Sequence, residues 1–272
     1  MINDFTPLSE KAHFIWRETL AIHRRSPETR IASSLSPIEI FVALYYGQIL
    51  KYFPKEPLSP LRDRFIISKG HGSICMYPIL ADLGYFAKDE LLRVCHSGSF
   101  LGGIPDPIIP GYETVNGSLG HGLGVSTGVA LALKRRKVQN DVFVLCGDGE
   151  LHEGANWEAA MFASHHELDN LNLIVDDNSI AMLGRTNEIV SHGNLKERFI
   201  SFGWDADLVD GHDIAALYHS LSQMKSKRKS APKVLIAKTI KGRGVPGLED
   251  MPLSHIMAPK RETLDALLEP KS

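Results

Sequence analysis

Two short segments of the sequence combine glycine with carboxylate or amide side chains, and each directly follows an apolar run. Gly-Asp-Gly-Glu stands at residues 147–150 and Asp-Asp-Asn at residues 176–178. Asp148 and Asn178 offer a carboxylate and an amide oxygen, hard ligands that suit Mg²⁺ or Ca²⁺, and such a cation keeps further positions for phosphate oxygens. The flanking glycines let the backbone approach a diphosphate closely. This pattern predicts a site for a divalent cation and a diphosphate.

The elements around these two segments are predicted to form a βαβ unit. The apolar runs 142–146 and 171–175 indicate strands, and residues 156–166 indicate a helix between them. Strands joined by such a crossover are parallel, and parallel sheets bind ligands outside the carboxyl ends of their strands. The helix also presents its N-terminus to negative charge. A Gly-Asp-Gly turn alone is commonplace, whereas the whole ordered arrangement is much more specific.

The rest of the sequence predicts an α/β fold with a mostly parallel central sheet flanked by helices. Ser36 is the expected cap of a second helix with Pro37 at its first position. We expect a single domain over residues 1–272 with a helical N-terminal segment. The further expected elements are helices at 9–24, 76–83, 119–133 and 214–224, strands at 64–68 and 234–237, a glycine loop at 69–72, and long loops at 96–117 and 242–259.

Composition argues against several classes of partner. Of the 272 residues 43% are hydrophobic, and the net charge of −2 leaves no excess of basic groups for a nucleic acid or an anionic membrane. We find no export signal and no apolar run of the ~20 residues that span a bilayer. Cys75, Cys95 and Cys146 have no paired spacing, so we expect them to be reduced, as in a cytoplasmic protein.

Four ordered segments resemble the transketolase family of thiamine diphosphate enzymes. The family signature is Gly-Asp-Gly followed about thirty residues later by a paired asparagine motif, which resembles residues 147–178 with Asp177 in place of the first asparagine. Residues 68–73 (SKGHGS), 113–122 (ETVNGSLGHG) and 238–245 (KTIKGRGV) resemble three further family segments. The resemblance implies the family's diphosphate-binding fold, with thiamine diphosphate and Mg²⁺ (or Ca²⁺) as cofactors.

The resemblance also implies roles for individual residues. His71 and His255 would reach the diphosphate or the reaction centre. Glu153 stands where the family has a glutamate that links two active sites across a subunit contact. The other implied contacts are those of Asp148, Asn178 and the main-chain carbonyl of Ile180 with the metal, and those of Gly149, Glu150, Gly117 and Leu119 with the cofactor, the last two through backbone groups at the aminopyrimidine.

Three positions of the expected substrate pocket depart from the family pattern. Arg30 stands where the family has a histidine that contacts the sugar donor, and Ile104 replaces another donor-side histidine. His121 stands where glutamine is usual. A guanidinium can grip a carboxylate or phosphate, but it cannot act as an imidazole acid or base at neutral pH. We therefore expect intact cofactor machinery beside a rebuilt substrate pocket.

The resemblance covers the first third to half of a full-length transketolase. In the family a second domain supplies the glutamate that hydrogen-bonds the pyrimidine ring, and no glutamate of this chain matches it. We therefore expect a separate C-terminal transketolase-like subunit to supply that domain, in an α₂β₂ assembly. The expected reaction moves a two-carbon ketol unit from a sugar or keto donor to an aldehyde acceptor.

Other functions remain compatible with the sequence. The α-type subunit of a 2-oxo acid dehydrogenase or decarboxylase is also part of a split thiamine enzyme, although residues 166–178 and 238–245 favour transketolase. A non-catalytic regulatory subunit could keep the fold without the chemistry. A plain dinucleotide-binding domain is disfavoured, because no Gly-x-Gly-x-x-Gly segment opens a helix after the first strand.

Overall fold

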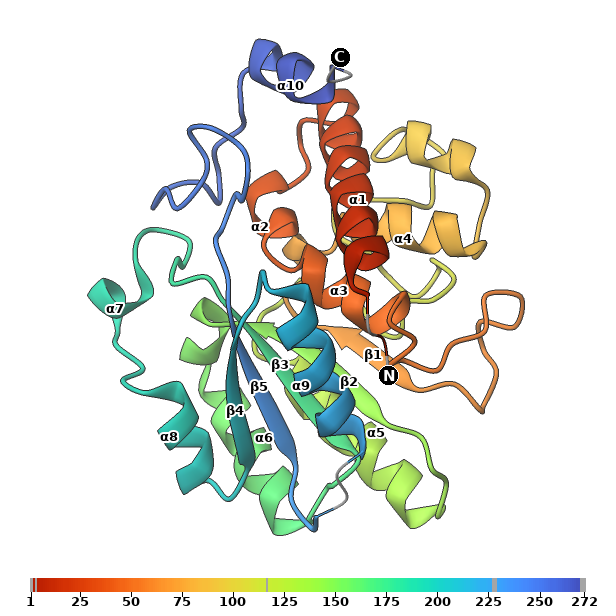
Figure 1. Cartoon of the computed structure of the whole chain (residues 1–272). Helices are drawn as coiled ribbons and strands as arrows, with labels where there is room; N and C mark the ends of the chain where they lie inside the picture. Colours follow the sequence, from red (N-terminus) through yellow and green to blue (C-terminus); the bar gives the residue numbers. More distant parts are fainter. Residues whose placement is uncertain (1, 3, 116, 227–228, 270–272) are drawn as a thin grey trace.

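The computed structural model describes residues 2, 4–115, 117–226 and 229–269. Its centre is a five-stranded sheet in the order β1-β2-β3-β5-β4, and all neighbouring strands are parallel (Figure 1). The predicted α/β fold class is confirmed. The strands are β1 (Arg64–Ile67), β2 (Val142–Gly147), β3 (Leu171–Asp177), β4 (Asp205–Asp210) and β5 (Lys233–Lys238).

Helices lie on both faces of the sheet, and long irregular segments connect them (Figure 1). The α-helices are α1 (Thr6–Arg25), α2 (Ile31–Leu35), α3 (Ile38–Tyr45), α4 (Met76–Leu83), α5 (Gly122–Arg135), α6 (Gly154–His165), α7 (Thr186–Ile189), α8 (Leu195–Ser201), α9 (Ile214–Ser226) and α10 (Arg261–Leu268), and short 3-10 helices are η1 (Gly70–Gly72), η2 (Lys88–Arg93) and η3 (Gly149–His152). No helix of the described residues is long and apolar enough to cross a membrane.

Alternate residues of the central strands belong to two separate clusters of buried apolar side chains. Phe143 and Leu145 of β2 pack in a cluster with α1, α3, α4 and α9, whereas Val144 and Cys146 pack in a cluster with α5, α6 and α8. A parallel strand that is buried on both faces must be apolar throughout, which explains the continuous apolar runs of the sequence. Packing on both faces fixes the carboxyl ends of the strands in space.

The predicted capping role of Ser36 is wrong. The short helix α2 ends at Leu35, and α3 begins after Pro37 without a side-chain cap. Ser36 instead donates its hydroxyl to Asp176 Oδ2 at 2.7 Å. A long-range partner at the end of β3 therefore outcompetes the local capping role, and it ties the junction between α2 and α3 to the sheet.

Two further boundaries differ from the prediction. Helix α5 begins at Gly122 rather than at residue 119, because Gly120 has a left-handed backbone (φ 84°) and donates its N–H to Glu150. Strand β4 was not predicted. It is the edge strand of the sheet, and most of its residues are at least partly exposed, so it lacks the apolar run that marks the central strands.

Candidate active site

A cavity of about 650 Å³ opens at the carboxyl ends of β1, β2, β3 and β5, a size typical of small-molecule sites. His121 caps α5 and is not among its lining residues. Asn116, part of the segment 113–122, lies outside the described residues. The predicted site residues that line the cavity together are Arg30, His71, Ile104, Gly117, Leu119, Asp148, Gly149, Glu150, Glu153, Asn178, Ile180 and His255.

Asp148 and Asn178 emerge side by side because they directly follow the last paired residues of β2 and β3. Asp148 is buried and accepts the hydroxyl of Thr186, and burial raises the pKa of its carboxyl group. Asn178 Oδ1 accepts the N–H of Ile180 at 3.2 Å and retains a second lone pair. The strand ends therefore place one carboxylate and one amide oxygen in the same cavity.

This ligand set is poor in acidic groups. Among the residues that the structure describes, no three His, Cys, Asp or Glu side chains gather in a way that could hold a metal. Asp148 is the one acid in the predicted set, and Asn178 and Ile180 provide neutral oxygens. A hard cation takes six or more oxygen ligands, so the remainder would come from water or from a bound diphosphate. We therefore expect the metal and the diphosphate to bind as a unit.

Two buried lysines lie in the same cavity, and the sequence patterns alone do not single them out. The ammonium of Lys69 forms an ion pair with Asp176, which also accepts the hydroxyl groups of Ser36 and Thr239. The side chain of Lys69 is 3% exposed. This network is therefore fully buried, and its positive and negative charges balance.

The ammonium of Lys241 is not paired with a described carboxylate in this way. Lys241 is buried, and its ammonium donates to the carbonyl oxygen of Ile180 at 3.2 Å. It forms no ion pair with any residue that the structure describes. Burial, together with the positive charge of Lys69, lowers the pKa of Lys241 to about 8. Both lysines stand inside the family-like segments, but only the structure shows that Lys241 forms no ion pair with a described residue.

Glu150 lines the cavity, yet its carboxylate is directed at the protein. It accepts the hydroxyl of Ser68 and the backbone N–H groups of Gly120 and Gly147, at 2.9 and 3.2 Å for the two amides. Burial raises the pKa of this carboxyl group. Glu150 therefore joins the ends of β1 and β2 to the turn before α5, and its predicted contact with the cofactor stays a prediction.

His71 and His255 meet edge to face across the cavity, with ring centroids 4.8 Å apart. Burial, together with the positive charges of Lys69, Lys241 and Arg30, lowers the pKa of His71 to about 2 and that of His255 to about 4. Both rings are therefore neutral at pH 7 in the free protein. They can donate and accept hydrogen bonds there without a fixed charge.

The mouth of the cavity combines charge with exposed apolar groups. Arg30 and Glu153 line it and are exposed. Ile104 and Met182 also line it, and each has about half of its surface exposed. In the two loops that border the cavity, Leu253 and Ile256 are also about half exposed, and Leu183 is more exposed still. An apolar surface around a polar cavity is typical of a site that another protein surface covers.

Known proteins share both the sequence and the fold of this chain. The family model described as "Transketolase, thiamine diphosphate binding domain" matches residues 32–268. The A subunit of the apulose-4-phosphate transketolase of Actinobacillus succinogenes is 38% identical over 97% of this chain and 96% of its own length. The protein of the same name from Phocaeicola vulgatus is 35% identical over 85% of this chain and 82% of its own length.

Solved structures agree. The transketolase of Campylobacter jejuni superposes with a TM-score of 0.89 at 30% identity, over 96% of this chain and 42% of its own. That of Leishmania mexicana gives 0.88 at 26% identity, over 96% of this chain and 40% of its own. The chain thus spans about two fifths of these transketolases but nearly all of the A. succinogenes protein. It therefore belongs to the transketolase family and contains the family's thiamine diphosphate-binding domain.

Proposed function

We propose that this chain, as a single diphosphate-binding domain, is the N-terminal subunit of a two-component transketolase. It would move a two-carbon ketol unit from a sugar or keto donor to an aldehyde acceptor, with thiamine diphosphate and Mg²⁺ (or Ca²⁺). One observation supports this most directly: a buried carboxylate, an amide oxygen and a buried ammonium without a carboxylate partner line one cavity at the ends of parallel strands.

The residues present fit the cofactor. The ammonium of Lys241 forms no ion pair with a described residue, and a diphosphate beside it would supply an anionic partner. Asp148, Asn178 and the Ile180 carbonyl would hold the cation that bridges to the diphosphate. Gly149 begins the 3-10 helix η3 beside Asp148 and lines the cavity, so its backbone would be available to phosphate oxygens.

The remaining residues would bind and orient the substrate. Thiamine diphosphate, when bound, supplies a nucleophilic carbon that attacks a carbonyl group. His71 and His255 are neutral, so they would hydrogen-bond the donor's hydroxyl or carbonyl oxygens rather than attract them by charge. Arg30 is a permanent cation at the mouth of the cavity and would bind an anionic substituent of the substrate. Ile104, which is also exposed there, has no polar group that could bind it. A phosphorylated sugar meets this requirement.

A partner chain would complete the site. The apolar groups around the mouth support a covering subunit, which would bring the pyrimidine-binding domain and its glutamate. Glu153 is exposed at the start of α6, where it could reach a second protomer, and α5 and α6 expose Val125, Met161 and Phe162. These features support an α₂β₂ assembly. The names of the A. succinogenes and P. vulgatus relatives imply the same division into subunits.

Cofactor binding tests the proposal first. With Mg²⁺ and the partner subunit present, thiamine diphosphate should raise the unfolding temperature of the complex, because a ligand stabilises the state that binds it. Asp148→Ala should abolish that shift, and Asp207→Ala, an exposed acid on the edge strand β4, should leave it unchanged. An unmodified complex that shows no shift at saturating cofactor would refute the proposal.

Substrate tests separate the remaining functions. The reconstituted pair should convert a ketose phosphate, with apulose 4-phosphate and xylulose 5-phosphate as the first candidates, and should do nothing to pyruvate. Decarboxylation of pyruvate would instead identify a 2-oxo acid dehydrogenase or decarboxylase subunit. If Asp148→Ala leaves every activity of the partner unchanged, the chain is a regulatory subunit that retains the fold.

A further inference from the structure

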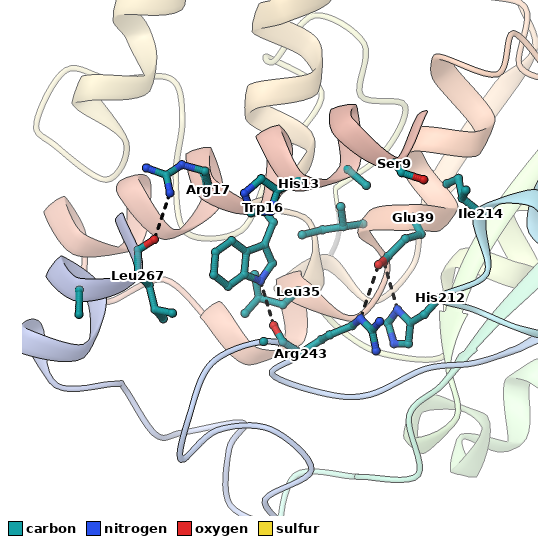
Figure 2. A pocket seen from close by; sticks show the side chains of 14 residues that line it. Ser9, His13, Trp16, Arg17, Leu35, Glu39, His212, Ile214, Arg243 and Leu267 are labelled. Atoms are coloured by element: carbon teal, nitrogen blue, oxygen red, sulfur yellow. Dashed lines mark hydrogen bonds and ion pairs between the residues drawn. The ribbon is translucent and has the colours of Figure 1, made fainter. Parts of the chain in front are cut away.

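A second cavity, of about 450 Å³, lies between α1, the start of α3, α10 and the loop after β5 (Figure 2). It is separate from the candidate active site, because the two share no lining residue. Its volume lies within the range of about 300–1,000 Å³ that small-molecule sites occupy. The residues that line it are Ser9, Ala12, His13, Trp16, Arg17, Leu35, Ile38, Glu39, His212, Ile214, Arg243, Gly244, Ala266 and Leu267.

One wall of this cavity is aromatic. The imidazole of His13 and the indole of Trp16 lie almost parallel, at 14° and with centroids 5.9 Å apart. Trp16 is held in place because its indole N–H donates to the carbonyl of Arg243 at 2.9 Å. The aliphatic side chains of Leu35, Ile38 and Leu267 line the cavity as well. Such a lining favours a flat, largely apolar ring.

The polar groups of the cavity are mainly cationic. Arg17 donates to the carbonyls of Leu267 and Leu268 at the end of α10, at 3.2 and 2.5 Å. Arg243 lies 3.7 Å from Glu39 (Figure 2). Both guanidinium groups have more N–H donors than these contacts use. Two arginines against one glutamate leave a positive balance. The cavity therefore also favours an anionic group.

A buried acceptor with unused capacity completes the set. Glu39 Oε2 lies 3.2 Å from His212 Nδ1, yet neither atom makes a hydrogen bond of acceptable geometry with the described residues. The side chain of His212 is 6% exposed, and its Nε2 accepts the N–H of Ile240, so Nδ1 carries the proton. A buried oxygen without a hydrogen bond is costly. An amino or ring N–H group of a ligand would relieve that cost.

We propose that this cavity is a second ligand site, which binds a small planar heteroaromatic compound with an anionic group. The ring lies along Trp16 and His13, the anion meets Arg17 and Arg243, and a ring or amino N–H meets Glu39. The ligand would touch the loop that carries Lys241 into the candidate active site, because Arg243 lies two residues further on. The site does not depend on the proposed transketolase activity.

Binding can be measured without cofactor or partner. The probes are two matched pairs, AMP with adenosine and orotate with uracil. Both members of each pair carry an amino or ring N–H group, and the second member lacks the anion. We expect AMP or orotate to saturate in ligand-observed NMR and to change the tryptophan fluorescence. The neutral partner should bind at least about tenfold more weakly. Trp16→Phe should remove the fluorescence change, since Trp157 and Trp204 lie in the apolar cluster on the other face of the sheet.

Two variants of α10 locate the site. Ala266 is exposed and lines the cavity, so Ala266→Phe should fill it and weaken binding at least about tenfold. Glu262→Phe places the same ring on the same helix, at an exposed position outside the cavity, and should bind like the parent. The proposal fails if neither anionic probe binds. It also fails if binding survives Ala266→Phe, or if the neutral probes bind equally well.

Discussion

The buried ammonium of Lys241, which forms no ion pair with a described residue, has the largest consequences at the scale of single residues. Lys69 pairs with Asp176, whereas Lys241 donates to a backbone carbonyl. A buried ammonium without an anion is costly, and the lowered pKa of Lys241, about 8, expresses that cost. An incoming diphosphate supplies the missing negative charge. Lys241 is therefore placed to bind an anion before one is present.

Lys241→Met tests this directly. The variant keeps the length of the side chain but removes its charge, so thiamine diphosphate should bind about 2 kcal/mol more weakly, a factor of roughly 30. Without cofactor the variant should be at least as stable as the parent, because an uncompensated buried charge has gone. Titration calorimetry and thermal unfolding of the same preparations measure both quantities. An unchanged affinity would show that Lys241 does not contact the diphosphate.

Lys69→Met is the matched contrast. It leaves Asp176 buried without its cation, so it should lower the stability of the cofactor-free protein by about 3–5 kcal/mol. Denaturant unfolding measures the loss. Equal stabilities of the Lys69→Met and Lys241→Met variants without cofactor would contradict the assignment of Lys69 as paired and Lys241 as unpaired.

His23 gives the protein a sensitivity to acid. It is buried against Thr29, and burial lowers its pKa to about 4 from an ordinary value of about 6.5. The unfolded chain therefore takes up this proton more readily, so stability is fully present above pH 6.5 and is lost as the pH falls to 4. The loss from this residue reaches up to about 3 kcal/mol. His23→Gln should flatten that slope in unfolding experiments between pH 7 and 4, and a slope equal to the parent's would contradict the assignment.

The sequence predicts a site residue when the pattern that marks it lies in the neighbouring residues of the chain. Asp148 and Asn178 follow apolar runs, so their meeting at one edge of the sheet follows from the order of the strands. The charge state of Lys241 depends on which groups lie nearby in space, and no neighbour in the sequence reveals it. The same holds for Glu150, whose partners Ser68 and Gly120 come from distant segments.

At the scale of elements, the start of α5 links the sheet to the cavity. Gly122 donates its N–H to the hydroxyl of Ser68 at 3.1 Å, and Ser68 in turn bonds to Glu150. The helix can approach β1 this closely because Gly122 has no side chain: a Cβ there would lie 2.9 Å from the Cα of Ser68. The position of α5 therefore depends on one glycine.

Gly122→Ala and Gly124→Ala should have opposite effects. The first forces α5 away from Ser68 and should cost about 1–3 kcal/mol of stability, as overpacking does. At Gly124 an added Cβ meets open space, so alanine should stabilise the helix by up to about 1 kcal/mol. Thermal unfolding of the isolated chain decides this. Equal effects of the two substitutions would show that α5 and β1 leave room for a Cβ atom at residue 122.

The difference between local patterns and long-range contacts also explains which elements can be predicted from the sequence. β2, β3 and β5 each contain a continuous apolar run because both of their faces are covered. The helices α4, α6 and α9 lie close to their expected bounds. β4 was not predicted because it is an edge strand whose residues, Val209 apart, are at least partly exposed, and such a strand keeps few apolar residues. The capping prediction for Ser36 is wrong because its hydroxyl donates a hydrogen bond to Asp176, a partner 140 residues away in the chain.

At the scale of the whole molecule, α5 and α6 expose apolar groups that the rest of the described chain does not cover. Val125 on α5 and Met161 and Phe162 on α6 are each about half exposed, and Glu153 precedes α6. Apolar surface of this kind on paired helices favours contact with another protein. We expect that contact to bring Glu153 of two protomers together in the complete assembly.

Phe162→Glu should therefore separate folding from assembly. The side chain is 41% exposed in the isolated chain, so its replacement should change the free energy of unfolding by no more than about 0.5 kcal/mol. In the mixture with the partner subunit, however, the substitution buries a charge in an interface and should cost at least about 2 kcal/mol of association, seen as a smaller species in sedimentation velocity. Leu208→Glu, on the outer strand β4, is equally exposed and should assemble like the parent. Sedimentation of the Phe162→Glu mixture as the parental complex would exclude α5 and α6 from the interface, and with them the proposed role of Glu153.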